Sequence, residues 1–98
     1  MESNIETHID NYLEFTKDLN KLTQFLRLKH YTKGLITNTH TKNPIVKLTV
    51  DIEYPTKEQT LEFSIPCKNI ANEQMRNLTL ESILFHILHR NTGELIHL

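Results

Sequence analysis

The clearest pattern along the chain is a strict alternation of apolar and polar residues from Ile45 to Tyr54. A period of two is typical of a strand that buries one face. A second alternating segment runs from Leu61 to Ile65 after a polar connection at 55–59, and Pro66 ends its pairing because proline has no backbone N–H to donate. The two segments predict an antiparallel hairpin with one buried face and one solvated face.

The first third of the chain has helical spacing instead. Residues Ser3 to Glu6 have the form of a capping box, and apolar residues then recur three, four and seven positions apart. We expect a helix from about Asn4 to Lys29. Its apolar stripe would consist of Ile5, Ile9, Tyr12, Leu13, Leu19, Leu22 and Leu26. Phe15 and Phe25 lie toward the flank of this stripe. The apolar surface is therefore wider than one packing seam requires, which suits either a broad core contact or an overhanging interface.

The remaining segments are less regular. A short strand is predicted from Gly34 to Thr39, and the polar stretch 67–76 is predicted to be a loop with room for one helical turn. Thr79 is a candidate cap for a second helix, and Gly93 would follow its end. The apolar face of that helix would comprise Leu80, Ile83, Leu84, Ile87 and Leu88. The tail 94–98 suits a short edge strand or packing against the second helix.

These elements predict one α+β domain over residues 1–98. A long N-terminal helix, a two- or three-stranded antiparallel sheet and a C-terminal helix would follow in that order, with both helices on one face of the sheet. The expected core is Leu22, Leu26, Leu48, Val50, Ile52, Leu61, Phe63, Ile65, Ile83, Leu84, Ile87 and Leu88.

Composition narrows the setting. The 98 residues include 11 Lys and Arg against 12 Asp and Glu, so no overall field would draw the protein to a polyanion or an acidic membrane. The apolar run from Ile83 to Leu88 is far shorter than a membrane span, and the first six residues lack the features of a signal peptide. Cys67 is the only cysteine, which excludes an intrachain disulfide. We expect a cytoplasmic protein with no membrane partner.

Candidate chemistry is sparse. His86 and His89 are three positions apart, a spacing at which two imidazoles can share a metal ion. However, the apolar positions of this helix imply that His86 and His89 face solvent. No Cys or acidic residue lies at a spacing that would add a third metal ligand to the two histidines. Asp51 and Glu62 fall on the solvated face of the hairpin, and no residue is placed by sequence to activate Cys67. We therefore expect a protein that is not an enzyme and has no metal or other cofactor.

The leading hypothesis for function is a non-enzymatic protein-binding module. It rests on the wide apolar surface of the first helix and on a free sheet edge, and homodimerisation through that helix is its simplest form. One Ala beside nine Asn, twelve Thr and ten Ile is typical of an AT-rich genome, which suggests a phage- or mobile-element-encoded factor that inhibits or redirects a host or defence protein. The expected contact residues are the aromatics Tyr12, Phe15, Phe25 and Tyr31.

The alternative hypothesis is a nucleic-acid-binding regulator. It would use the basic segment that follows the first helix, through Arg27, Lys29, Lys33 and Lys42. The order helix, three strands, helix resembles that of double-stranded-RNA-binding domains. The likeness stops at element order, because the segment from Leu78 to Ser82 has none of the lysines that such domains place on phosphates.

Overall fold

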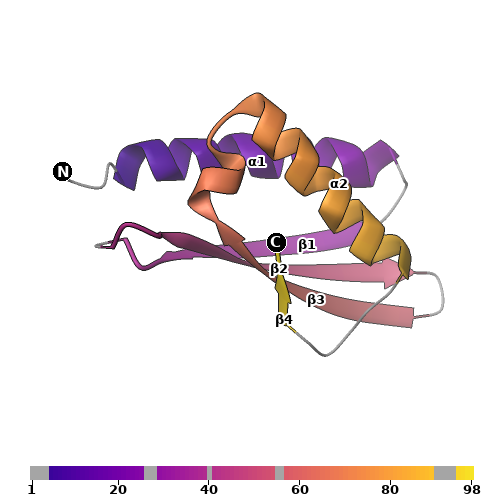
Figure 1. Cartoon of the computed structure of the whole chain (residues 1–98). Coiled ribbons are helices and arrows are strands. Elements are labelled where there is room, and N and C mark those ends of the chain that lie inside the picture. Colours follow the sequence, from indigo (N-terminus) through magenta and orange to yellow (C-terminus); the bar gives the residue numbers. More distant parts are fainter. Residues whose placement is uncertain (1–4, 26–28, 40, 55–56, 90–94) are drawn as a thin grey trace.

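The structure is a computed structural model that describes residues 5–25, 29–39, 41–54, 57–89 and 95–98. Two α-helices lie on one face of a twisted sheet, and a 3₁₀ turn closes one end between the layers (Figure 1). In chain order the elements are α1 (Ile5–Phe25), β1 (Lys29–Thr37), β2 (Ile45–Tyr54), β3 (Lys57–Pro66), η1 (Cys67–Ile70), α2 (Glu73–His89) and β4 (Leu95–His97).

The sheet has four strands in the order β1-β2-β3-β4. The pairs β1–β2 and β2–β3 are antiparallel, whereas β3 and β4 are parallel. The expected α+β class with both helices on one face is confirmed. The predicted sheet of two or three antiparallel strands is corrected to a four-stranded mixed sheet, because the tail forms the parallel strand β4.

The boundary between α1 and β1 differs from the prediction. Lys29 was expected to end the helix, but it already pairs with Glu53 as the first residue of β1. The strand therefore begins five positions before the predicted one at Gly34. Between α1 and β1, residues 26–28 lie outside the described residues, as does the capping residue Ser3.

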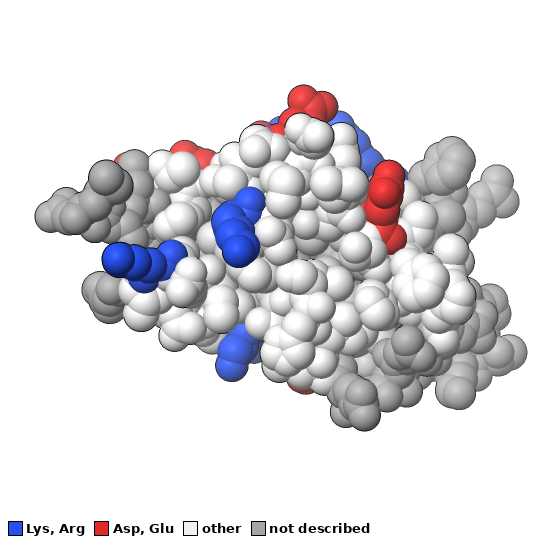
Figure 2. All heavy atoms as spheres, in the orientation of Figure 1, with Lys and Arg blue, Asp and Glu red and all other residues white. Residues whose placement is uncertain are grey.

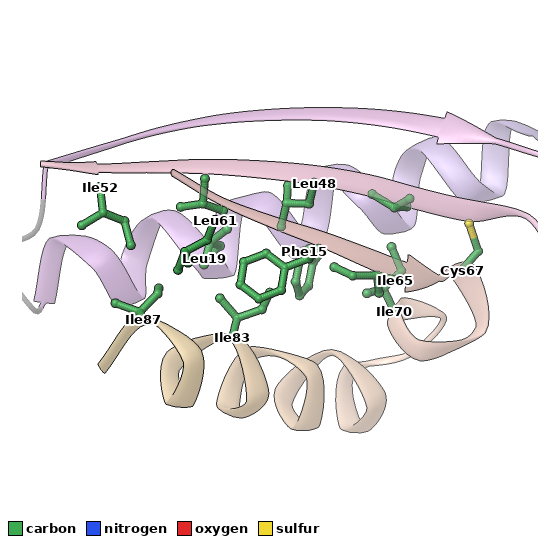
Figure 3. Packing of buried hydrophobic residues seen from close by; sticks show 13 residues of the cluster. Phe15, Leu19, Leu48, Ile52, Leu61, Ile65, Cys67, Ile70, Ile83 and Ile87 are labelled. Atoms are coloured by element: carbon green, nitrogen blue, oxygen red, sulfur yellow. The ribbon is translucent and has the colours of Figure 1, made fainter. Parts of the chain in front are cut away.

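The core fills the space between the sheet and the two helices (Figure 3). The predicted residues of β2 and β3 are buried, as are Ile83 and Ile87 of α2. Leu22 and Leu84 are only partly buried, and Leu26 lies outside the described residues. Leu88 was expected in the core, but it is 58% exposed because it lies one residue, about 100° of helix rotation, beyond Ile87. The buried hydrophobic residues outside the expected core set are Phe15, Leu19, Val46, Cys67 and Ile70.

The start of α2 also differs from the prediction. The side-chain oxygen of Asn72 accepts a hydrogen bond from the Met75 N–H at 2.9 Å, which is the geometry of a helix N-cap. Thr79, the predicted cap, lies inside the helix, where its hydroxyl donates to the Asn69 carbonyl at 2.7 Å. That bond ties α2 to η1.

Candidate protein-binding surfaces

The first surface is the outer edge of β1. Among the described strands, β1 pairs only with β2, so its other side presents the backbone N–H and C=O groups of a nine-residue strand. The opposite edge of the sheet is β4, which has three residues. A long unpaired edge is a template for an additional strand.

The second surface is an apolar ridge on α1, formed by Ile5, Ile9 and Leu13 at intervals of four residues. These side chains are between 42% and 58% exposed. Each helical turn takes 3.6 residues, so nine positions place Ile9 opposite Asp18 and Leu13 opposite Leu22. Asp18 and Leu22 line the groove toward α2. The α1 ridge therefore lies on the flank of α1 that faces away from α2.

The third surface is the outer face of α2, formed by Leu78, Phe85 and Leu88. Each of these side chains is more than half exposed, while Ile83 and Ile87 on the other side of the helix are fully buried. A helix with apolar residues on both faces usually has a neighbour on both. The ring of Phe85 stacks on His89 with the ring centroids 4.0 Å apart.

An open groove of about 390 Å³ separates α1 from α2. It combines apolar side chains with charged ones of both signs, an arrangement that suits a side chain of a bound protein. The residues that line it are Asp18, Lys21, Leu22, Asn77, Leu80, Glu81 and Leu84.

The aromatic contact residues expected from the sequence do not form one exposed group. Phe15 is fully buried in the core, so its expected exposure was wrong. Tyr12 is partly buried, and burial raises the pKa of its hydroxyl. The side chains of Phe25 and Tyr31 lie outside the described part of the chain. The exposed aromatic that the sequence analysis missed is Phe85, which could have been found because its position is 200° of helix rotation away from Ile83.

The basic residues of the alternative hypothesis are spread out. Lys33 is exposed in the middle of β1, and Lys42 is exposed in the turn between β1 and β2. Arg27 and the side chain of Lys29 lie outside the described part. Figure 2 shows the blue Lys and Arg side chains as separate islands among uncharged atoms on the face drawn. Helix α2 begins at Glu73 and contains no lysine, and Arg76 in its first turn donates to the Ile70 carbonyl at 3.3 Å.

The groups that could carry chemistry are dispersed as well. His86 does not face solvent as expected: it is partly buried, with its ring 6.1 Å from that of Phe63. His89 is exposed, and its Nδ1 donates to the Phe85 carbonyl at 2.8 Å. No three His, Cys, Asp or Glu side chains converge on a possible metal position within the described residues. Cys67 is buried, and burial raises the pKa of its thiol.

Comparisons of the chain with protein-family models, curated proteins and solved structures found no match. None of the described helices is both long enough and apolar enough to cross a membrane.

Proposed function

We propose that the chain is a non-enzymatic protein-binding module. One observation carries the proposal: among the described side chains, six large apolar ones are exposed on the outer sides of the two helices, although other apolar residues of both helices pack into the core. Single exposed apolar residues are ordinary on protein surfaces, but these are grouped three to a helix. The six residues are Ile5, Ile9 and Leu13 on α1 and Leu78, Phe85 and Leu88 on α2.

The helices suit this role because the core holds them in place. An exposed aromatic on a fixed helix binds a partner with little loss of side-chain entropy, and Phe85 is already held against His89. A module without chemistry of its own acts by occupying a surface of its partner. In this way it would inhibit or redirect a host or defence protein.

The first experiment is affinity capture of the tagged chain from the lysate of its native host, with nuclease treatment and washes at low and high salt. A protein recovered in stoichiometric amount after nuclease and high salt supports the proposal. Recovery of nucleic acid alone, lost at high salt, would instead support the alternative hypothesis of a nucleic-acid-binding regulator that uses the basic segment from Arg27 to Lys42, because phosphate contacts weaken steeply with salt.

Matched variants sharpen the capture. The double variant Leu78→Ser and Phe85→Ser removes two apolar groups from the outer face of α2, and we expect it to lose much of a partner that binds there. Leu95→Ser is the control, because Leu95 is also exposed and apolar but lies on β4, at the opposite edge of the sheet from β1. Sedimentation of the wild-type chain over a range of concentrations tests whether a second copy is the partner.

A further inference from the structure

The outer edge of β1 and the α1 ridge lie on the same side of the molecule. The ring end of Tyr12 occupies the space where a side chain at Gly34 would stand, so α1 runs directly over β1. The α1 ridge is on the flank of α1 turned away from α2, which is the flank over the outer edge. A strand added beside β1 would therefore lie beneath Ile9 and Leu13.

The two features also coincide along the strand. Tyr12 lies over Gly34, and α1 and β1 run in opposite directions because a short connection joins them. Leu13 is one residue from Tyr12 and Ile9 is three, or about 5 Å along the helix at about 1.5 Å per residue. At about 3.3 Å per residue in β1, these two side chains are level with the segment from Lys33 to Thr37.

The other face of an added strand would meet a different environment. Lys33 is exposed and pairs with Thr49 on β2, which in turn pairs with Glu62 on β3. Glu62 is thus two strands away, at about 10 Å. Asp51 is nearer, because it pairs with Tyr31 and is the diagonal neighbour of Lys33 on β2 at about 7–8 Å, but its carboxylate already accepts a hydrogen bond from Thr60. No ion pair joins Lys33 to another described side chain, so the residue opposite it on a fifth strand would be its nearest possible counter-charge.

We propose that this side of the molecule binds an extended segment of a partner protein as a fifth strand, in which apolar residues alternate with acidic ones. The apolar residues would pack against the α1 ridge, and an acidic residue would face Lys33. The backbone groups of the segment would pair with those of β1. This proposal rests on the protein-binding function and specifies the partner for one of its surfaces.

A second copy of the chain fits the edge poorly. In a two-fold antiparallel pairing of β1 with itself, the Lys33 side chains of the two copies would lie on the same face of the joined sheet. In a register centred on Lys33 the two like charges would be directly opposite and destabilising, and in any register β1 has no acidic residue that could pair with Lys33. Charge therefore favours a different, acidic strand over self-pairing.

The test uses the full chain and a synthetic ten-residue peptide of alternating valine and glutamate at pH 7. Three control peptides separate the contributions of pattern, charge and backbone. The first has five valines followed by five glutamates, the second replaces glutamate with lysine, and the third is N-methylated at its four central residues. We expect each control to bind at least about tenfold more weakly, because each removes one of the three contributions.

Amide hydrogen exchange followed by NMR locates the contact. The outward N–H groups of β1 are those of every second residue, so the peptide should slow exchange at alternate positions between Lys33 and Thr37. Protection on the outer face of α2 instead, or none on β1, would overturn the proposal. The same protection in the chain alone, rising with its concentration, would mean that a second copy covers the edge and would also overturn it.

Paired variants complete the test. We expect Lys33→Glu to weaken peptide binding about three- to tenfold, and Lys42→Glu, with the same change of charge, less than about twofold. Ile9→Glu and Leu13→Glu should each weaken it about tenfold, and Leu88→Glu on α2 should leave it unchanged. Equal effects of Lys33→Glu and Lys42→Glu, or of the α1 variants and Leu88→Glu, would contradict a site at the β1 edge. Circular dichroism tests whether each variant is folded. If Ile9→Glu does not fold, Leu13→Glu still tests the contact with the α1 ridge.

The two proposals fail in different ways. A peptide that does not bind, beside a captured protein that resists salt, overturns only the fifth-strand proposal. Capture of nucleic acid alone overturns the protein-binding function.

Discussion

Leu13 and Phe15 are two positions apart on α1 and have opposite environments. Leu13 is 58% exposed on the α1 ridge, whereas Phe15 is fully buried against the sheet. A rotation of 200° separates them, so a single helix carries both an exposed apolar ridge and a core face. On the same helix, Phe15 therefore contributes to the stability of the fold, whereas Leu13 is available to a binding partner.

Phe15→Ala should lower the free energy of unfolding by about 3–5 kcal/mol, because it removes a buried ring and leaves a cavity. Leu13→Ala should change it by less than about 0.5 kcal/mol, since the side chain is mostly in water. Urea denaturation of both variants measures the difference. Similar losses for the two would contradict the orientation of α1.

Gly34 leaves room for the ring end of Tyr12. Replacing Gly34 with Ala places a methyl group where the ring end of Tyr12 lies, and we expect a loss of about 1–3 kcal/mol. In a Tyr12→Ala background the methyl group has space, so the same change should cost less. Thermal or urea unfolding of the four chains gives the coupling between the two positions. A coupling near zero would show that Tyr12 does not lie over Gly34.

Cys67 should react slowly in the folded chain. Burial raises its pKa above the ordinary value of 9.0, so at pH 8 less of the thiol is ionised than in the unfolded chain, and the buried sulfur is also shielded. Alkylation by iodoacetamide at pH 8, followed by mass spectrometry, should be at least about tenfold slower than in urea. Equal rates would place the sulfur at the surface.

The residue scale also shows what the sequence could not decide. Both the stripe through Leu13 and the one through Phe15 have helical spacing, so periodicity alone predicts the helix but does not tell which side meets the sheet. Tertiary packing decides it, through the contact between Tyr12 and Gly34. Phe15 was assigned to the surface for this reason.

At the scale of elements, the sequence predicted best where one face of an element is apolar and regular. Strand β2 has the predicted bounds Ile45 to Tyr54, because its alternation is complete. The first residues of β1, β3 and α2 were missed; β3 begins at Lys57, inside the stretch 55–59 that was predicted as the connection. On β1, position 34 faces the helix but is a glycine, and the space of its missing side chain is filled by Tyr12, so the alternating pattern is broken there. Helix α2 begins with polar residues, so its first turn lacks the apolar spacing that marks the rest of the helix.

The cap of α2 gives a prediction at this scale. Asn72→Ala removes the acceptor for the Met75 N–H and should lower the free energy of unfolding by about 1 kcal/mol. Asn77→Ala is the matched control, because Asn77 is exposed within the helix, where alanine has a higher helix propensity than asparagine. The control should be neutral or slightly stabilising in urea denaturation. A smaller loss for Asn72→Ala than for Asn77→Ala would contradict the assigned start.

At the scale of the whole molecule, the sheet is paired unevenly. Among the described strands, β2 has a long neighbour on each side, whereas β1 has one neighbour and β4 has three residues paired with β3. We expect amide hydrogen exchange to be slowest in β2 and fastest at β4, with a difference of at least about a hundredfold, because protection follows the free energy of local opening. Uniform exchange over the four strands would show that the sheet opens only as a unit.

Strand β4 also has a consequence for the order of assembly. The antiparallel strands β1 to β3 are neighbours in the sequence, so their pairing closes short loops, whereas β4 joins Ser64 to His97 across roughly thirty residues that include α2. Folding therefore leaves β3 exposed until α2 has docked. During that interval β1 and β3 both present a long open edge. Strand β4 then covers Glu62 to Ser64 of β3, so the last strand to arrive shortens one of the two edges at which a nascent chain could join its neighbours.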